Sequence, residues 1–224
     1  MNRATRTTLS TLGVMMGLAG IEHGVGEALQ GSAAPKGLVI ASWPTSEFLH
    51  IVGGEPAMTL IPNLLVTGVA AILASLIFTA WAIWFIQRKH GGPILMLLSI
   101  ALLLVGGGFA PPLMGLILGA VATRINSALG WWQAHLAADL RYSLGVEWLG
   151  LLVSCVFVWL LLFPGAAMLA YFCGVNDPDL VLGLSLNAVV FLGLTILSAF
   201  AHDIGEPAGI CQPPSTAGRP TAGS

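Results

Sequence analysis

The uncharged stretch 93–123, PILMLLSIALLLVGGGFAPPLMGLILGAVAT, decides how many times this 224-residue chain crosses a membrane. A helix needs about 20 residues to cross the roughly 30 Å apolar core of a bilayer. One long helix through this stretch gives the chain five spans, whereas a hairpin gives it six. Residues 106–112 contain three glycines and two prolines, which suit a turn better than a helix interior. The stretch therefore predicts two helices, about 93–109 and 111–127.

The chain as a whole is nearly free of charge. Hydrophobic residues make up 56% of it and charged residues 8%, with a mean hydropathy of +0.89. Because about a quarter of the residues in a soluble domain are charged, this composition excludes a soluble enzyme, a nucleic-acid-binding protein and a disordered protein. It predicts an all-α, polytopic integral membrane helical bundle whose solvent is the lipid bilayer. The expected spans are about 8–30, 61–87, 93–109, 111–127, 146–173 and 180–202.

The positions of the eight Lys and Arg residues favour six spans over five. Cytoplasmic loops of membrane proteins carry an excess of basic residues. With six spans and the N-terminus inside, only Lys36 lies outside and the other seven basic residues lie inside. Five spans would leave four on each side. We therefore expect a multi-pass protein of the cell inner membrane with both termini in the cytoplasm. A broken, re-entrant arrangement of 111–127 is the alternative, because that helix is short for a crossing.

Three segments lie outside the expected spans. They are an outer loop, 31–60, an inner amphipathic segment, 131–142, and a C-terminal tail, 205–224, whose Pro, Gly, Ser and Thr content predicts disorder. Within the outer loop we expect a short surface helix over 42–52, with Gly53 and Gly54 as its stop.

A secretory signal peptide is the alternative interpretation of the first span. Arg3 and Arg6 would form the basic region of such a peptide and 9–21 its apolar region. However, Glu22 and Glu27 lie between that apolar region and any small-residue cleavage site, which is too far downstream. We therefore expect the segment to be retained as a helix.

Ionisable side chains inside a span are costly and are functional candidates by default. The first span holds Glu22, His23 and Glu27, and the last two are i,i+4 neighbours that can share a proton, bind one metal ion or simply fix helix packing. In the outer loop, Glu47 and His50 have a metal-compatible spacing, although a solvated surface helix explains a lone pair better. If the loop folds back over the first helix, all five side chains can meet in one outward-facing pocket that binds a cation or protons. Whether a metal or another cofactor binds is left open.

Four glycines form a narrow stripe along the same helix. They are Gly13, Gly17, Gly20 and Gly24. Two Gly-x-x-x-Gly pairs result, and such pairs let another helix approach closely. We therefore assign these glycines to helix packing, either within the chain or against a partner.

The acidic residues add a functional expectation. Six acids and one base are expected outside: Glu22, Glu27, Glu47, Glu55, Asp177, Asp179 and Lys36. An acidic mouth concentrates cations. We therefore expect a small transporter or channel-like protein for a cation or protons. The alternatives are an accessory protein that packs against a membrane partner or a second copy, and a metal-dependent enzyme. The enzyme is least favoured because the chain contains no recognised catalytic motif.

Overall fold

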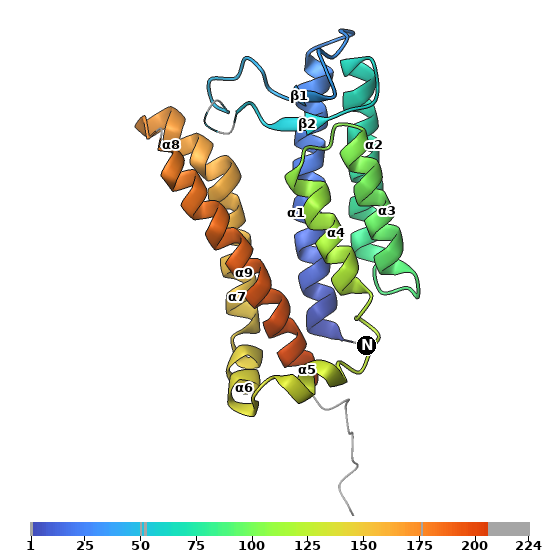
Figure 1. Ribbon diagram of the computed structural model, residues 1–224, viewed down its shortest axis with the longest axis vertical. Coiled ribbons are helices and arrows are strands. Elements are labelled where there is room, and N and C mark those ends of the chain that lie inside the picture. The colour runs from blue at the N-terminus through green and yellow to red at the C-terminus, as the bar shows by residue number, and fades with distance from the viewer. Residues whose placement is uncertain (1, 50, 52, 176, 206–224) are drawn as a thin grey trace, which may run out of the picture.

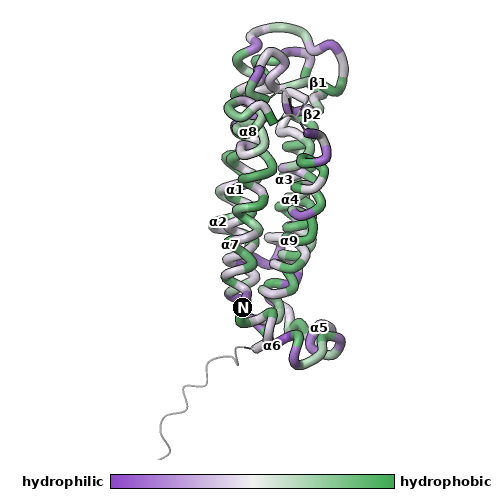
Figure 2. Tube along the Cα trace, turned by 90° about the vertical axis from the view of Figure 1, so that its left-hand side faces the viewer, coloured by the Kyte–Doolittle hydropathy of each residue, from purple (hydrophilic) through white to green (hydrophobic). Residues whose placement is uncertain are grey.

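The computed structural model describes residues 2–49, 51, 53–175 and 177–205. Over these residues the chain is mostly helical, and three helices are long and apolar enough to cross a membrane: Leu64–Trp84, Trp148–Cys173 and Asp179–Gly205. Figure 2 shows that hydrophobic residues dominate the bundle between its two ends. The chain is therefore a helical membrane protein. The expected disordered tail, 205–224, lies outside the described residues except for Gly205.

The elements follow one another along the chain as two groups of helices (Figure 1). They are α1 (Arg3–Leu29), β1 (Val39–Ala41), β2 (Pro56–Met58), α2 (Leu64–Trp84), α3 (Gly91–Leu104), α4 (Ala110–Ala122), α5 (Gly130–His135), α6 (Ala138–Val146), α7 (Trp148–Leu160), the π-helical turn η2 (Leu161–Gly165), α8 (Ala166–Cys173) and α9 (Pro178–Gly205). In Figure 1, α1 to α4 stand together, and α7 to α9 lean away from them toward the end that holds the strands. We call that end the loop end, and the end with the start of α1 the terminal end.

The stretch that decides the number of spans forms two antiparallel helices rather than one. The chain leaves α3 at Leu104 and enters α4 at Ala110. Gly106 and Gly108 between them have φ of +97° and +76°, which glycine adopts without steric cost. At about 20 Å each, however, α3 and α4 are shorter than the apolar core of a bilayer. Six crossings therefore remain a prediction.

The glycine stripe of α1 is packed against α2. A β-carbon placed on Gly24 would lie 2.7 Å from the Gly68 carbonyl oxygen, and one on Gly13 would lie 2.6 Å from the Ala82 β-carbon. Gly17 and Gly20 meet side chains of α2 in the same way. The two backbones approach closely because these positions carry no side chain.

Hydrogen bonds join the start of α1 to the end of α9. The Asp203 carboxylate accepts from the backbone N–H of Ala4 at 2.9 Å and of Thr5 at 2.8 Å, and from the Thr5 hydroxyl at 2.6 Å. A carboxylate suits a helix N-terminus because the first N–H groups there have no partner within the helix. The start of α1 and the end of α9 consequently lie at the same end of the bundle.

One local expectation was wrong. The described residues of 42–52 form no α-helix, and β1 instead pairs with β2 as a small antiparallel sheet in a mostly helical fold. Gly53 and Gly54, at φ of +66° and +69°, reverse the chain instead of ending a helix. The inner segment 131–142 forms two short helices, α5 and α6, because the backbone is extended at Leu136.

Filling the α1–α2 contact should disrupt the fold. We expect Gly24→Leu to lower the melting temperature of the purified protein by several degrees or to prevent its folding, because overpacking costs about 1–3 kcal/mol or more. Gly193→Leu is the matched control, since a β-carbon at this α9 position meets nothing within 4 Å. Thermal melting in detergent measures both variants. Equal melting temperatures would contradict the packing described.

Candidate functional site

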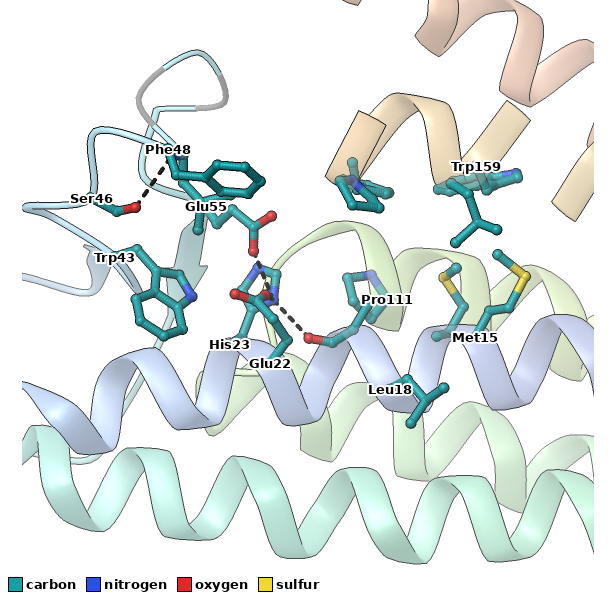
Figure 3. Close-up of a pocket in the computed structure, with 16 residues that line it drawn as sticks. Met15, Leu18, Glu22, His23, Trp43, Ser46, Phe48, Glu55, Pro111 and Trp159 are labelled. Atoms are coloured by element: carbon teal, nitrogen blue, oxygen red, sulfur yellow. Dashed lines mark hydrogen bonds and ion pairs between the residues drawn. The ribbon is translucent and has the colours of Figure 1, made fainter. Parts of the chain in front are cut away.

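Two carboxylates and one imidazole converge near the loop end of α1 (Figure 3). The Nδ1 atom of His23 lies 3.2 Å from Glu22 Oε2 and 3.4 Å from Glu55 Oε2. Glu22 and His23 are adjacent on α1, whereas Glu55 comes from the outer loop directly before β2. We call these three residues the acid–imidazole cluster.

The small sheet positions Glu55 above α1. The backbone N–H of Ser42 donates to the Glu55 carbonyl at 3.0 Å, which extends the pairing of β1 with β2 toward the glycine turn. The outer loop thus does fold over the first helix, but it brings a different acid from the one expected. Glu47 is exposed and does not line the cavity beside the cluster, and His50 lies outside the described residues.

His23 acts as a hydrogen-bond donor in this geometry. Its Nδ1 atom lies 2.9 Å from the Ala19 carbonyl oxygen, and a carbonyl only accepts, so Nδ1 carries a proton. The Nε2 atom lies against Gly108, where a β-carbon would collide with it. Candidate ligand atoms of the cluster lie within 4.8 Å of one another, a spacing compatible with a metal ion. Because Nδ1 is protonated, however, the geometry is that of a hydrogen-bonded acid–imidazole cluster.

Glu27 lies apart from the cluster. Its side chain is fully buried, and its Oε1 atom accepts from the Ser42 hydroxyl at 3.3 Å. Its Oε2 atom has no hydrogen-bond partner among the described residues and faces Gly106, where a β-carbon would collide with it. The expected His23–Glu27 pair is thus replaced by pairs of His23 with Glu22 and Glu55.

Sequence reasoning missed the second role of the triple glycine. The α3–α4 turn was predicted only as a turn, yet Gly106 covers Glu27 and Gly108 covers the ring of His23. Sequence spacing gives no sign of this, because the turn and α1 are far apart in the chain. The one available signal for Glu55 was its position directly after two glycines that reverse the loop.

A cavity of about 500 Å³ adjoins the acid–imidazole cluster. It lies between α1, the outer loop, the start of α4 and the α7–η2 segment, and the cluster forms its polar end (Figure 3). Its apolar walls include Met15, Leu18, Trp43, Phe48, Trp159 and Phe163. At the loop end, Phe48 also contacts Tyr171 of α8, with ring centroids 5.9 Å apart. The site therefore combines acidic groups with an apolar chamber.

Glu55 is the member of the cluster that lies in the outer loop. Burial raises the pKa of its carboxyl to about 8, the neighbouring Glu22 adds to this rise, and His23 opposes it. The residue is 7% exposed, and apart from its 3.4 Å contact with His23 Nδ1 its Oε2 atom has no hydrogen-bond partner among the described residues. Glu55 can therefore take up and release a proton near neutral pH.

Comparison of the chain with protein-family models, with curated proteins and with solved structures gives no match. The functional argument therefore depends on the site itself.

The raised pKa of Glu55 predicts a pH-dependent stability. The unfolded chain ionises this carboxyl near its ordinary pKa of 4.5 and the folded chain near 8, so wild type loses stability as the pH rises between these values. Gln cannot ionise. We expect Glu55→Gln to melt roughly 5 °C above wild type at pH 9, and the gain to vanish at pH 4. A variant that melts below wild type at pH 9 would contradict the raised pKa.

Proposed function

We propose that the protein is a small multi-pass membrane transporter or channel-like protein that handles a cation or protons at an outward-facing site. The observation that carries this proposal is the convergence of Glu22, His23 and Glu55 at the polar end of the cavity. Ionisable groups placed in apolar surroundings are costly and are kept for ion or proton pathways. Sequence reasoning expected this chemistry here, with Glu47 and His50 in place of Glu55.

The chemistry of the site is an exchange of a proton for a cation. With its pKa near 8, Glu55 is mostly protonated at pH 7. A cation that reaches the cluster favours the ionised carboxylate, so the carboxyl releases its proton and the carboxylate pairs with the cation. Net charge at the site is conserved in this step, which avoids leaving an unpaired charge in apolar surroundings.

The placement of basic residues supports an outward-facing cavity. Asn2 and Asn126 donate to the carbonyls of Arg124 and Gln87, which ties the start of α1, the end of α4 and the α2–α3 turn together at the terminal end. The basic residues there are Arg3, Arg6, Arg88, Lys89 and Arg124. Lys36 belongs to the outer loop. By the positive-inside rule, the terminal end is cytoplasmic in this proposal.

The outer loop also supports two crossings for the α3–α4 hairpin. Thr59 pairs with Val105, and the Leu60 N–H donates to the Leu104 carbonyl at 3.0 Å, so the loop meets the tip of the hairpin. The outer loop therefore covers the non-helical backbone between α3 and α4. Such backbone is tolerated within a membrane where protein buries it. Six spans with both termini inside follow as part of this proposal.

The accessory-protein alternative has less support. It relied on the glycine stripe of α1 and on the inner amphipathic segment 131–142 as surfaces for a partner, and α2 of the same chain fills the first of these surfaces.

Transport can be tested in liposomes that carry a pH-sensitive dye. Under an imposed gradient of a monovalent cation we expect the wild-type protein to move protons in exchange for the cation, and Glu55→Gln and His23→Ala to reduce the rate at least tenfold. Asp179→Asn is the matched control, because it removes an exposed acid of the outer side away from the cavity. Equal rates in wild type and both site variants, or no rate above empty liposomes, would refute the proposed function.

Orientation can be tested with single cysteines. In a background without the three native cysteines, we expect Lys36→Cys to react with a membrane-impermeant maleimide on intact cells. Arg88→Cys should react only after permeabilisation. The opposite labelling pattern would place the cavity on the cytoplasmic side.

A further inference from the structure

We infer that the ligand of this site is a lipophilic organic cation, a molecule with one positive charge on an apolar or aromatic body. This inference deepens the proposed function and rests on the same acid–imidazole cluster. It follows from the charge at one end of the cavity, the apolar walls, and the direction in which the cavity opens.

The polar end of the cavity is acidic. Glu22 and Glu55 both line it, and the only basic group beside them is the imidazole of His23 among the described residues. The Glu55 Oε2 atom is buried at the cavity and, beyond its 3.4 Å contact with His23 Nδ1, has no hydrogen-bond partner among the described residues. Once Glu55 has released its proton, a cationic group on a ligand would pair with this buried carboxylate.

The remaining walls suit an apolar body. Aromatic rings of Trp43, Phe48, Trp159 and Phe163 line the cavity, and such rings attract organic cations over their faces. Met15 and Met16 add flexible side chains that adapt to ligands of different shape. A volume of about 500 Å³ is within the usual range for a site that holds a drug-sized molecule.

The π-helical turn η2 forms part of this wall. Pro164 has no N–H and its ring displaces the carbonyl four residues earlier, so the helix widens and Ala166 donates to Leu161, five residues back. Phe163 and Pro164 of this turn both line the cavity. The break in the α7–α8 helix thus lies at the cavity itself.

The cavity opens sideways onto the apolar surface of the bundle. Leu18 and Leu160 line it, yet they are 58% and 49% exposed. In a bilayer these side chains face lipid, so a ligand can enter from the membrane. An apolar cation partitions into a membrane readily, whereas a hydrated metal ion does not.

A metal ion fits these observations less well. The Nδ1 atom of His23 donates a hydrogen bond and Nε2 is covered by Gly108, so the imidazole offers no free lone pair. A bare metal ion would also leave most of the apolar chamber unused.

Tetraphenylphosphonium tests the inference, because its charge does not change with pH. We expect the purified full-length protein in detergent to bind it saturably in equilibrium dialysis, with empty micelles subtracted. Tetraphenylborate, which has the same shape and the opposite charge, should bind at least tenfold more weakly. Absence of saturable phosphonium binding, or equal binding of the two ions, would overturn the inference.

Variants distinguish the contribution of the two acids to binding from that of the apolar walls. Glu55→Gln and Glu22→Gln should each weaken phosphonium binding at least tenfold, while Asp179→Asn should stay within twofold of wild type. Ala19→Phe fills the apolar wall without removing a charge and should also weaken binding at least tenfold. Each variant is first shown to elute as a single symmetric peak. Glu22 is half-buried, so Glu22→Gln is the variant more easily tolerated by the fold. Unchanged affinity in both Glu55→Gln and Glu22→Gln would overturn the inference.

The binding and flux measurements can fail independently. Proton flux that depends on Glu55, without phosphonium binding, would overturn the ligand class and leave the proposed function standing. Phosphonium binding that depends on Glu55, without flux, would support the ligand class and refute transport.

Discussion

The loop end of the molecule is organised around ionisable side chains that α1 carries into apolar surroundings. A buried charge or an unpaired carboxyl is costly, so each of these groups must be paired, hydrogen-bonded or covered. The outer loop supplies Glu55 to His23 and the Ser42 hydroxyl to Glu27. The α3–α4 turn covers both side chains with backbone, because Gly106 and Gly108 carry no β-carbon to obstruct them. Loop, turn and helix therefore depend on one another.

Contacts with the rest of the bundle fix the position of α1. The glycine stripe fixes α1 against α2, and Asp203 caps the opposite end of the helix. On the remaining side, α7 and α9 lean away from α1 toward the loop end, as Figure 1 shows. The cavity lies on that side, lined by the acid–imidazole cluster and by Phe163 and Pro164 of η2. The ionisable side chains and the apolar walls thus line the same cavity.

The sequence predicted those features that depend on local composition. Helices without charge, the glycine turn and the close approach at Gly24 all follow from the residue types within one segment. The partner of His23 could not be predicted, because Glu55 reaches it only after the loop reverses and pairs β1 with β2. The Glu47–His50 spacing drew attention to Glu47 rather than Glu55, and spacing within a helix has no meaning where the described residues form no α-helix. Contacts between distant segments required the structure.

In the proposed exchange, a cation displaces a proton at Glu55. Proton release on addition of tetraphenylphosphonium to weakly buffered protein at pH 7 measures this directly. The titratable groups beside Glu55 are Glu22 and His23 of α1, and the cavity walls from α4, α7 and η2 contribute none among the described residues. We predict about 0.9 protons released per cation bound by wild type, given a pKa near 8, and none by Glu55→Gln. Cation binding without proton release, or equal release from both proteins, would contradict the proposed exchange.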